Sequence, residues 1–171
     1  MTIDSGRDTI QGREVSMSNS DHTASVRMLM NAERQGVLCT LSRKFDGWPF
    51  GSVTPYALSA SGEPIILVSD LAEHTRNVRA DPRVSLFIQD SAATNDPQAG
   101  ARLTLMGLAV PVAEGELDEA QQRYLERFPE ARQNFQLGDF TLFKIELRQA
   151  RFIGGFGQMF WLPREEFTLQ R

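Results

Sequence analysis

The sequence predicts a mainly β (α+β) protein in which six to seven antiparallel strands form a barrel with peripheral helices. Apolar runs of strand length recur along the chain and are separated by turn sequences such as Asp46-Gly47 and Ser61-Gly62. Helical spacing of apolar residues occurs at only a few joints between these runs. Strands in this meander-like order would leave unpaired edges, so closure into a barrel is favoured.

Two regions are expected along the chain. Residues 1–20 mix polar residues without an apolar period and are predicted to be a flexible tail, whereas residues 21–171 form one domain. The expected helices cover residues 21–35, 70–80, 115–128 and 131–135. The expected strands cover residues 37–42, 50–59, 65–69, 83–89, 102–113, 139–147 and 150–153. The strand 102–113 is apolar on both faces, which predicts burial on both sides and a homodimer with a large apolar interface.

Composition excludes several classes of function. A net charge of −4 argues against nucleic acid as a partner, and no apolar run approaches the ~20 residues that span a membrane. Two histidines and the single Cys39 cannot build an ordinary structural zinc site, so no metal site is predicted. A lone cysteine and the lack of a secretory signal at the N-terminus predict a cytoplasmic protein.

The segment from Val68 to Asp90 carries the strongest signal for a binding site. Asp70 is a candidate cap of a short helix, with Glu73 three residues later, and Asp81-Pro82 ends it. A helix start favours anions, and the polar side chains on its first turns suit a phosphate group. These side chains belong to His74, Thr75, Arg76 and Asn77. The alternative is an ordinary surface helix with a solvated polar face.

The chain lacks a complete catalytic apparatus of its own. No GxSxG elbow, Walker loop or dinucleotide-binding glycine motif is present, and Gly154 to Gly157 is interpreted as a tight turn. Any enzymatic chemistry must therefore come from a cofactor.

Three stretches together resemble a known family. They are Gly36 to Tyr56, Val68 to Leu86, and Asp139 to Leu162. They are similar, in this order, to the opening hairpin, the phosphate segment and the closing strands of the FMN-binding split barrels. The last stretch resembles the haem-utilisation (HugZ-like) branch, whose members are relatives of pyridoxamine 5′-phosphate oxidase.

The resemblance implies a role for particular residues. FMN would lie at the interface of a homodimer, with its phosphate on Thr75, Arg76 and Asn77 beside His74, and its ribityl chain near Ser69. Gln158 or Trp161 would reach the cofactor of the partner subunit, although simple interface packing is an alternative for Trp161. The residues implied to line the isoalloxazine, largely through backbone groups, are Ser52, Val53, Thr54, Pro55 and Tyr56.

Departures from the family pattern narrow the expected activity. Leu103, where the true oxidases carry glutamine, argues against vitamin B6 oxidation, as does the missing C-terminal Arg-x-His element. No histidine follows His74, which argues against haem breakdown through a C-terminal iron ligand. The expected function is an FMN-dependent oxidoreductase of unassigned substrate, with an electron donor such as NAD(P)H. The alternatives are a haem-utilisation protein, a flavin or haem carrier, and an inactive relative. Any haem binding is expected to be weak and without defined histidine ligation.

Overall fold

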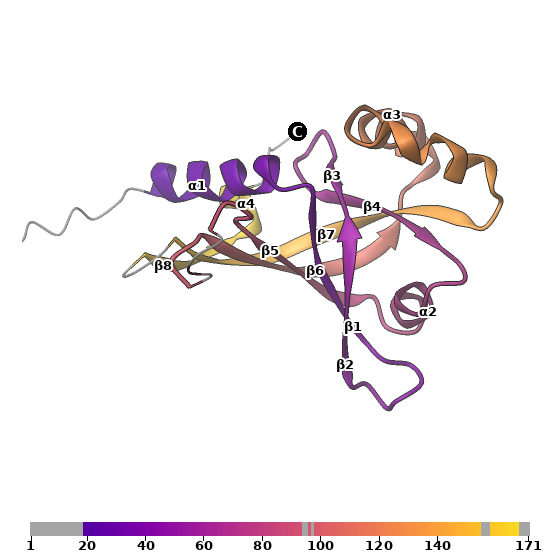
Figure 1. Cartoon of the computed structure of the whole chain (residues 1–171), viewed down its shortest axis with the longest axis horizontal. Helices are drawn as coiled ribbons and strands as arrows, with labels where there is room; N and C mark the ends of the chain where they lie inside the picture. Colours follow the sequence, from indigo (N-terminus) through magenta and orange to yellow (C-terminus); the bar gives the residue numbers. More distant parts are fainter. Residues whose placement is uncertain (1–18, 94–95, 97, 155–157, 168–171) are drawn as a thin grey trace, which may run out of the picture.

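The computed structural model describes residues 19–93, 96, 98–154 and 158–167, and its chain is dominated by antiparallel strands (Figure 1). Its elements are α1 Asn19–Ala32, β1 Gln35–Leu41, β2 Pro49–Pro55, β3 Ala57–Leu58, β4 Pro64–Ser69, α2 Glu73–Ala80, β5 Arg83–Gln89, β6 Arg102–Pro111, η1 Glu114–Glu116, α3 Leu117–Arg127, η2 Pro129–Gln136, β7 Phe140–Ile153, β8 Met159–Pro163 and α4 Arg164–Phe167. Residues 1–18 of the predicted tail lie outside the described part, whereas Asn19 and Ser20 already belong to α1.

The predicted antiparallel split barrel is confirmed by the strand order. The sheet runs β2-β1-β5-β6-β7-β4-β3, and β8 pairs with β7 outside this path. One edge of β7 is covered by β6, and its other edge is shared by β4 along residues 140–144 and by β8 along residues 149–153. Because β4 and β8 pair with different parts of the same edge of β7, the sheet splits into two branches along that edge.

Two predicted strand boundaries differ from the structure. The expected strand 50–59 is divided, because β2 pairs with β1 whereas β3 pairs with β4. The expected break between strands 139–147 and 150–153 is absent, since β7 is continuous. A register shift opposite Met106 and Gly107 allows Arg148 and Gln149 both to be exposed within one strand. The strand β8 was not predicted from the sequence.

The core fills the inside of the barrel. Alternate residues of the long strands point inward, such as Leu38, Leu86 and Leu105, each of which is fully buried. The helix α1 covers this cluster with Val26 and Met30. A second cluster joins α3 to β3 and β4 and includes Ala120, Tyr124 and Phe128.

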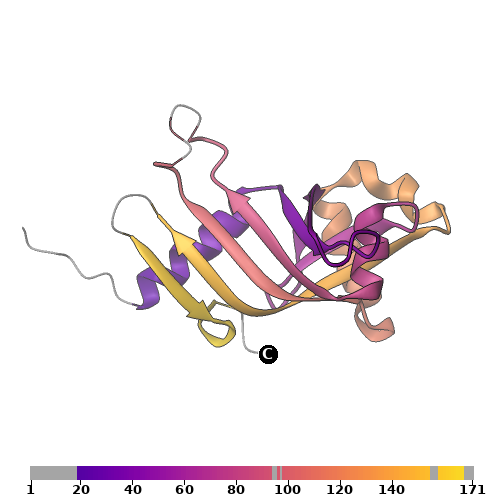
Figure 2. The same ribbon diagram turned by 90° about the horizontal axis from the view of Figure 1, so that it is seen from below.

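The opposite face of the sheet is open. Figure 2 shows strands β5, β6 and β7 from the side on which no described helix crosses them, with α1 behind. None of the helices in the described part of the chain is long and apolar enough to cross a membrane.

Candidate functional site

The helix α2 is anchored differently from the predicted capping box. Its N-cap is Ala72, without a side-chain hydrogen bond, whereas Asp70 forms an ion pair with Arg79 in the last turn. Asp70 lies two residues before the N-cap, in the turn after β4, where its backbone N–H donates to the carbonyl of Asp139. The predicted end is confirmed, since the helix stops at Ala80 and Asp81 is its C-cap.

Two of the predicted phosphate ligands face the protein interior. Thr75 is 1% exposed, and its hydroxyl donates to the carbonyl of Ser69 at 2.7 Å. Asn77 is fully buried; its Nδ2 donates to Thr40 Oγ1 at 3.0 Å, and its Oδ1 accepts from the backbone N–H of Arg43 at 2.9 Å. Both side chains therefore fasten α2 to the sheet, and their polar groups are already paired within the chain.

Arg76, between them, is placed differently. Its side chain is 45% exposed and lies 3.4 Å from Glu73, a contact that solvent weakens. Among Thr75, Arg76 and Asn77, only the guanidinium of Arg76 is therefore open to a ligand.

His74 and Ser52 come together although they are 22 residues apart. The ring Nδ1 of His74 lies 3.1 Å from Ser52 Oγ, within hydrogen-bond distance. His74 is half-buried, and this burial lowers the pKa of the imidazole below its ordinary value, so that the neutral ring is favoured near pH 7. Among the described residues, no partner is found for Nε2 of this ring.

The segment Ser52 to Tyr56 does not present one common surface. Val53 and Pro55 point outward, whereas Thr54 is buried. Tyr56 is fully buried, and its hydroxyl donates to the carbonyl of Met30 at 2.9 Å. Because successive side chains of a strand point to opposite faces, only some of these side chains could contact one ligand, and the implied contact through backbone groups stays a prediction.

The other predicted residues lie apart from His74. Ser69 Oγ donates to Asp139 Oδ2 at 2.8 Å and accepts from the N–H of Leu71. Gln158 is exposed just before β8, and Trp161 on that strand lies against Arg151, with 5.3 Å between guanidinium and ring. In both views β8 and α2 lie at opposite ends of the sheet, so these residues do not meet His74 within one subunit (Figures 1 and 2).

A groove of about 490 Å³ crosses the open face of the sheet, and the sequence reading did not predict it. Its apolar walls include Leu41, Met106 and Leu108, and Arg83 and Arg148 contribute charge. The available signal was the strand alternation, because three outward residues of β1 and three of β6 are also apolar, and the structure keeps them half-buried.

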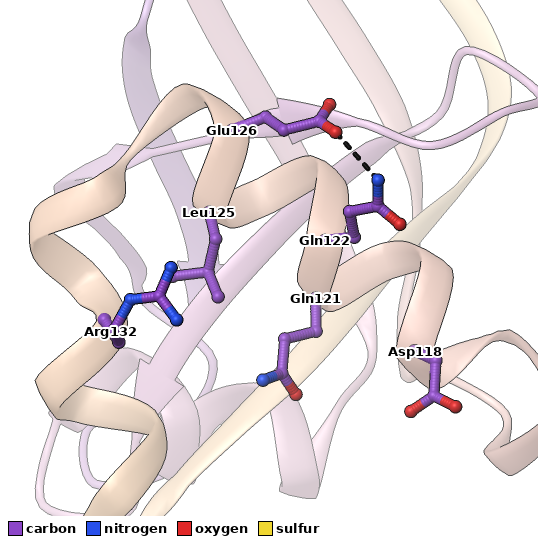
Figure 3. A pocket seen from close by; sticks show the side chains of 6 residues that line it. All are labelled: Asp118, Gln121, Gln122, Leu125, Glu126 and Arg132. Atoms are coloured by element: carbon purple, nitrogen blue, oxygen red, sulfur yellow. Dashed lines mark hydrogen bonds between the residues drawn. The ribbon is translucent and has the colours of Figure 1, made fainter.

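A second hollow, of about 400 Å³, lies between α3 and η2 (Figure 3). Its lining is mostly polar, and Gln122 Nε2 donates to Glu126 Oε1 at 2.9 Å along one side. Arg132 reaches into it from η2 beside Leu125. The hollow shares no lining residue with the groove or with the neighbourhood of His74.

Comparison with known proteins identifies the family. A family profile described as "CREG, beta-barrel" matches residues 17–169. The chain belongs to this CREG beta-barrel family. The resemblance to the haem-utilisation branch of the split barrels is confirmed at the same time, as the following relatives show.

The CREG-type chain is 35% identical over 159 residues to "Non-canonical heme oxygenase HOZ, chloroplastic" of Arabidopsis thaliana, covering 93% of this chain and 48% of HOZ. It therefore spans about half the length of that relative. It is 34% identical over 126 residues to "Heme oxygenase HutZ" of Vibrio cholerae, covering 71% of each protein. Among solved structures, a haem-binding protein from Mycobacterium smegmatis has a TM-score of 0.79 at 33% identity, covering 90% of this chain and 61% of that one.

These relatives correct the cofactor prediction. The named relatives are haem oxygenases and a haem-binding protein, so the expectation of an FMN cofactor and an FMN-dependent oxidoreductase is wrong. The geometry gives a physical reason, because a flavin phosphate would need Thr75 and Asn77, whose polar groups are used inside the protein. The haem alternative is the better supported one.

Proposed function

We propose that this protein binds haem and takes part in its oxidative breakdown. The observation that carries the proposal is the 35% identity to a haem oxygenase over 93% of the chain. The second haem oxygenase, at 34% identity, supports the same assignment.

The surroundings of α2 fit such a ligand. Haem is a flat apolar ring with two carboxylates, so it needs an apolar surface beside cationic groups. Phe45 and Trp48, on the turn between β1 and β2, are 61% and 73% exposed. The same turn is tied to α2 by the hydrogen bond from the N–H of Arg43 to Asn77. The backbone of this turn is therefore fixed against the helix that carries Arg76, and Arg43 is among the exposed residues of the turn.

Each group then has a defined task. When bound, haem supplies the iron at which oxygen is activated. Arg43 and Arg76 would pair with the two carboxylates of the haem, and Phe45 and Trp48 would exclude water from the haem ring. The electron donor, such as NAD(P)H, is part of the proposal.

A haemin titration followed by turnover tests this function. We expect a saturable Soret band, and then loss of that band with formation of a bilin when a reductant and oxygen are supplied, with catalase present to remove peroxide. Replacing both Arg43 and Arg76 by alanine should weaken binding by about tenfold or more, because a charge-assisted contact contributes roughly 1.5–3 kcal/mol. Arg132→Ala, in the α3–η2 hollow, is the matched control and should leave the affinity unchanged.

Two outcomes contradict parts of this proposal. A wild-type protein without a saturable Soret band would overturn haem binding. Saturable binding without bilin formation would leave a haem carrier and overturn the catalytic role.

We further propose that two copies associate through the open face of the sheet. Each of β1, β5 and β6 carries apolar outward residues that are half-buried, including Val37, Phe87 and Met106, and no described helix covers them. A second copy would remove this surface from water, which is the main driving force of obligate dimers.

A charge on this face should separate the copies. Val37→Glu is expected to convert a dimer into a monomer, because its cross-strand neighbours are the apolar Val53 and Phe87, so the added carboxylate would be unpaired in the interface and would lose its hydration. Light scattering measures the mass against the 19.2 kDa of one chain. Leu137→Glu, at an exposed leucine after η2, is the control and should remain dimeric. A wild-type mass of one chain at micromolar concentration would contradict the interface.

A further inference from the structure

The residue that would bind the haem iron is not assigned by the sequence relationship. Iron in haem takes a strong axial bond from His, Cys, Met or Tyr. The chain has two histidines, one cysteine and two tyrosines, together with six methionines. For the tyrosines, the cysteine and the histidines, burial and the partner of the donor atom distinguish the candidates.

The tyrosines are unsuitable because both are inside the protein. Tyr56 is fully buried with its hydroxyl on the carbonyl of Met30, and Tyr124 is 3% exposed. Burial raises the pKa of both phenols, and that of Tyr124 to about 12, so neither offers a phenolate. Cys39 lies within the groove of the sheet face, where we place the second copy.

The two histidines differ in how their rings are held. A ligating histidine almost always donates its second ring N–H to an oxygen, which fixes both its tautomer and its orientation. His22 is stacked on Phe160 with 3.8 Å between ring centroids, and no hydrogen bond to its ring is found among the described residues. His74 has the required partner in Ser52 Oγ.

The position of His74 is also fixed by its surroundings. Thr75 and Asn77, on either side of Arg76, bind Ser69 and Thr40 and hold α2 against the sheet. Ser52 lies in the middle of β2, whose seven residues are all paired with β1. The imidazole and its oxygen partner are therefore carried by two elements that are fastened to the same sheet.

Resting on the proposed function, we propose that His74 is the axial ligand of the haem iron through Nε2, with Ser52 as its positioning residue. The Nδ1–H donates to Ser52 Oγ, and this selects the tautomer whose Nε2 lone pair points away from β2. The bond to iron is formed by that lone pair, so no proton or electron is exchanged. Arg76, two positions further along α2, is then available for a haem carboxylate.

This arrangement replaces the expectation that haem would bind without defined histidine ligation. That expectation assumed that FMN occupied the space beside His74, and the relatives remove the assumption.

Spectroscopy of haemin complexes tests the assignment. Wild type and His22→Ala should both give a sharp, stoichiometric Soret band and, after reduction, an iron–histidine stretching band in resonance Raman spectra. His74→Ala should lose this Raman band and bind at least about 100-fold more weakly, and added imidazole should restore the band. Circular dichroism establishes that each variant is folded.

Ser52 variants separate positioning from simple packing. Ser52→Ala should shift the iron–histidine stretching frequency and lower affinity by roughly 10- to 100-fold, as expected for loss of an outer partner. Ser52→Thr keeps the hydroxyl and suits a strand, so it should restore the wild-type frequency.

The possible outcomes are distinct. Unchanged spectra in folded His74→Ala, or loss of the band in His22→Ala, would overturn the assignment while leaving haem binding intact. An unchanged frequency in Ser52→Ala would overturn the positioning role. Absence of a Soret band in wild type would instead reject the proposed function.

Discussion

Replacing Asn77 by alanine is expected to lower the free energy of unfolding by about 2–4 kcal/mol, because it removes a fully buried amide together with both of its hydrogen bonds. Asn77 is fully buried, and its amide joins the hydroxyl of Thr40 to the backbone N–H of Arg43. Urea denaturation measures the loss as a lower midpoint at constant slope.

Arg76→Ala is the matched control for this prediction. Its side chain is exposed on the adjacent position of the same helix, so its removal should change stability by no more than about 0.5 kcal/mol. Equal losses in the two variants would contradict the view that Asn77 fastens α2 whereas Arg76 serves a ligand.

Gly107→Ala is expected to destabilise the protein by about 3 kcal/mol or more, at the upper end of overpacking effects. A Cβ atom at this position would lie 2.3 Å from the carbonyl oxygen and 2.9 Å from the carbonyl carbon of Glu146. These are backbone atoms of β7, so the clash cannot be relieved by rotating a side chain. The register shift between Met106 and Gly107 lies at the same point, and the variant should disturb it.

Gly115→Ala provides the comparison, since nothing lies within 4 Å of its added Cβ atom. It should be neutral or slightly stabilising, because alanine reduces the freedom of the unfolded chain. Thermal unfolding of both variants measures the difference, and a Gly107→Ala protein as stable as Gly115→Ala would show that the close approach of β6 and β7 is not required.

The sequence by itself determined the strand-rich fold and the position of α2. Period-two patterns and turn residues are local signals, so strands such as Arg83–Gln89 could be predicted within about a residue. The stop at Asp81-Pro82 could be predicted for the same reason, because proline acts on its immediate neighbour. The motif order also indicated the split-barrel family.

Only the tertiary structure decided which polar side chains are available for a ligand. Thr75, Arg76 and Asn77 look equivalent as a polar run, yet two of them are turned inward by partners on other elements. Ser52 and His74 are paired because β2 and α2 pack against the same strand, β1. Such contacts depend on the closure of the sheet, and local sequence patterns contain no information about where a distant partner will lie. The same reason explains why the sequence predicted a phosphate site at α2, whereas the folded chain presents an oriented imidazole there.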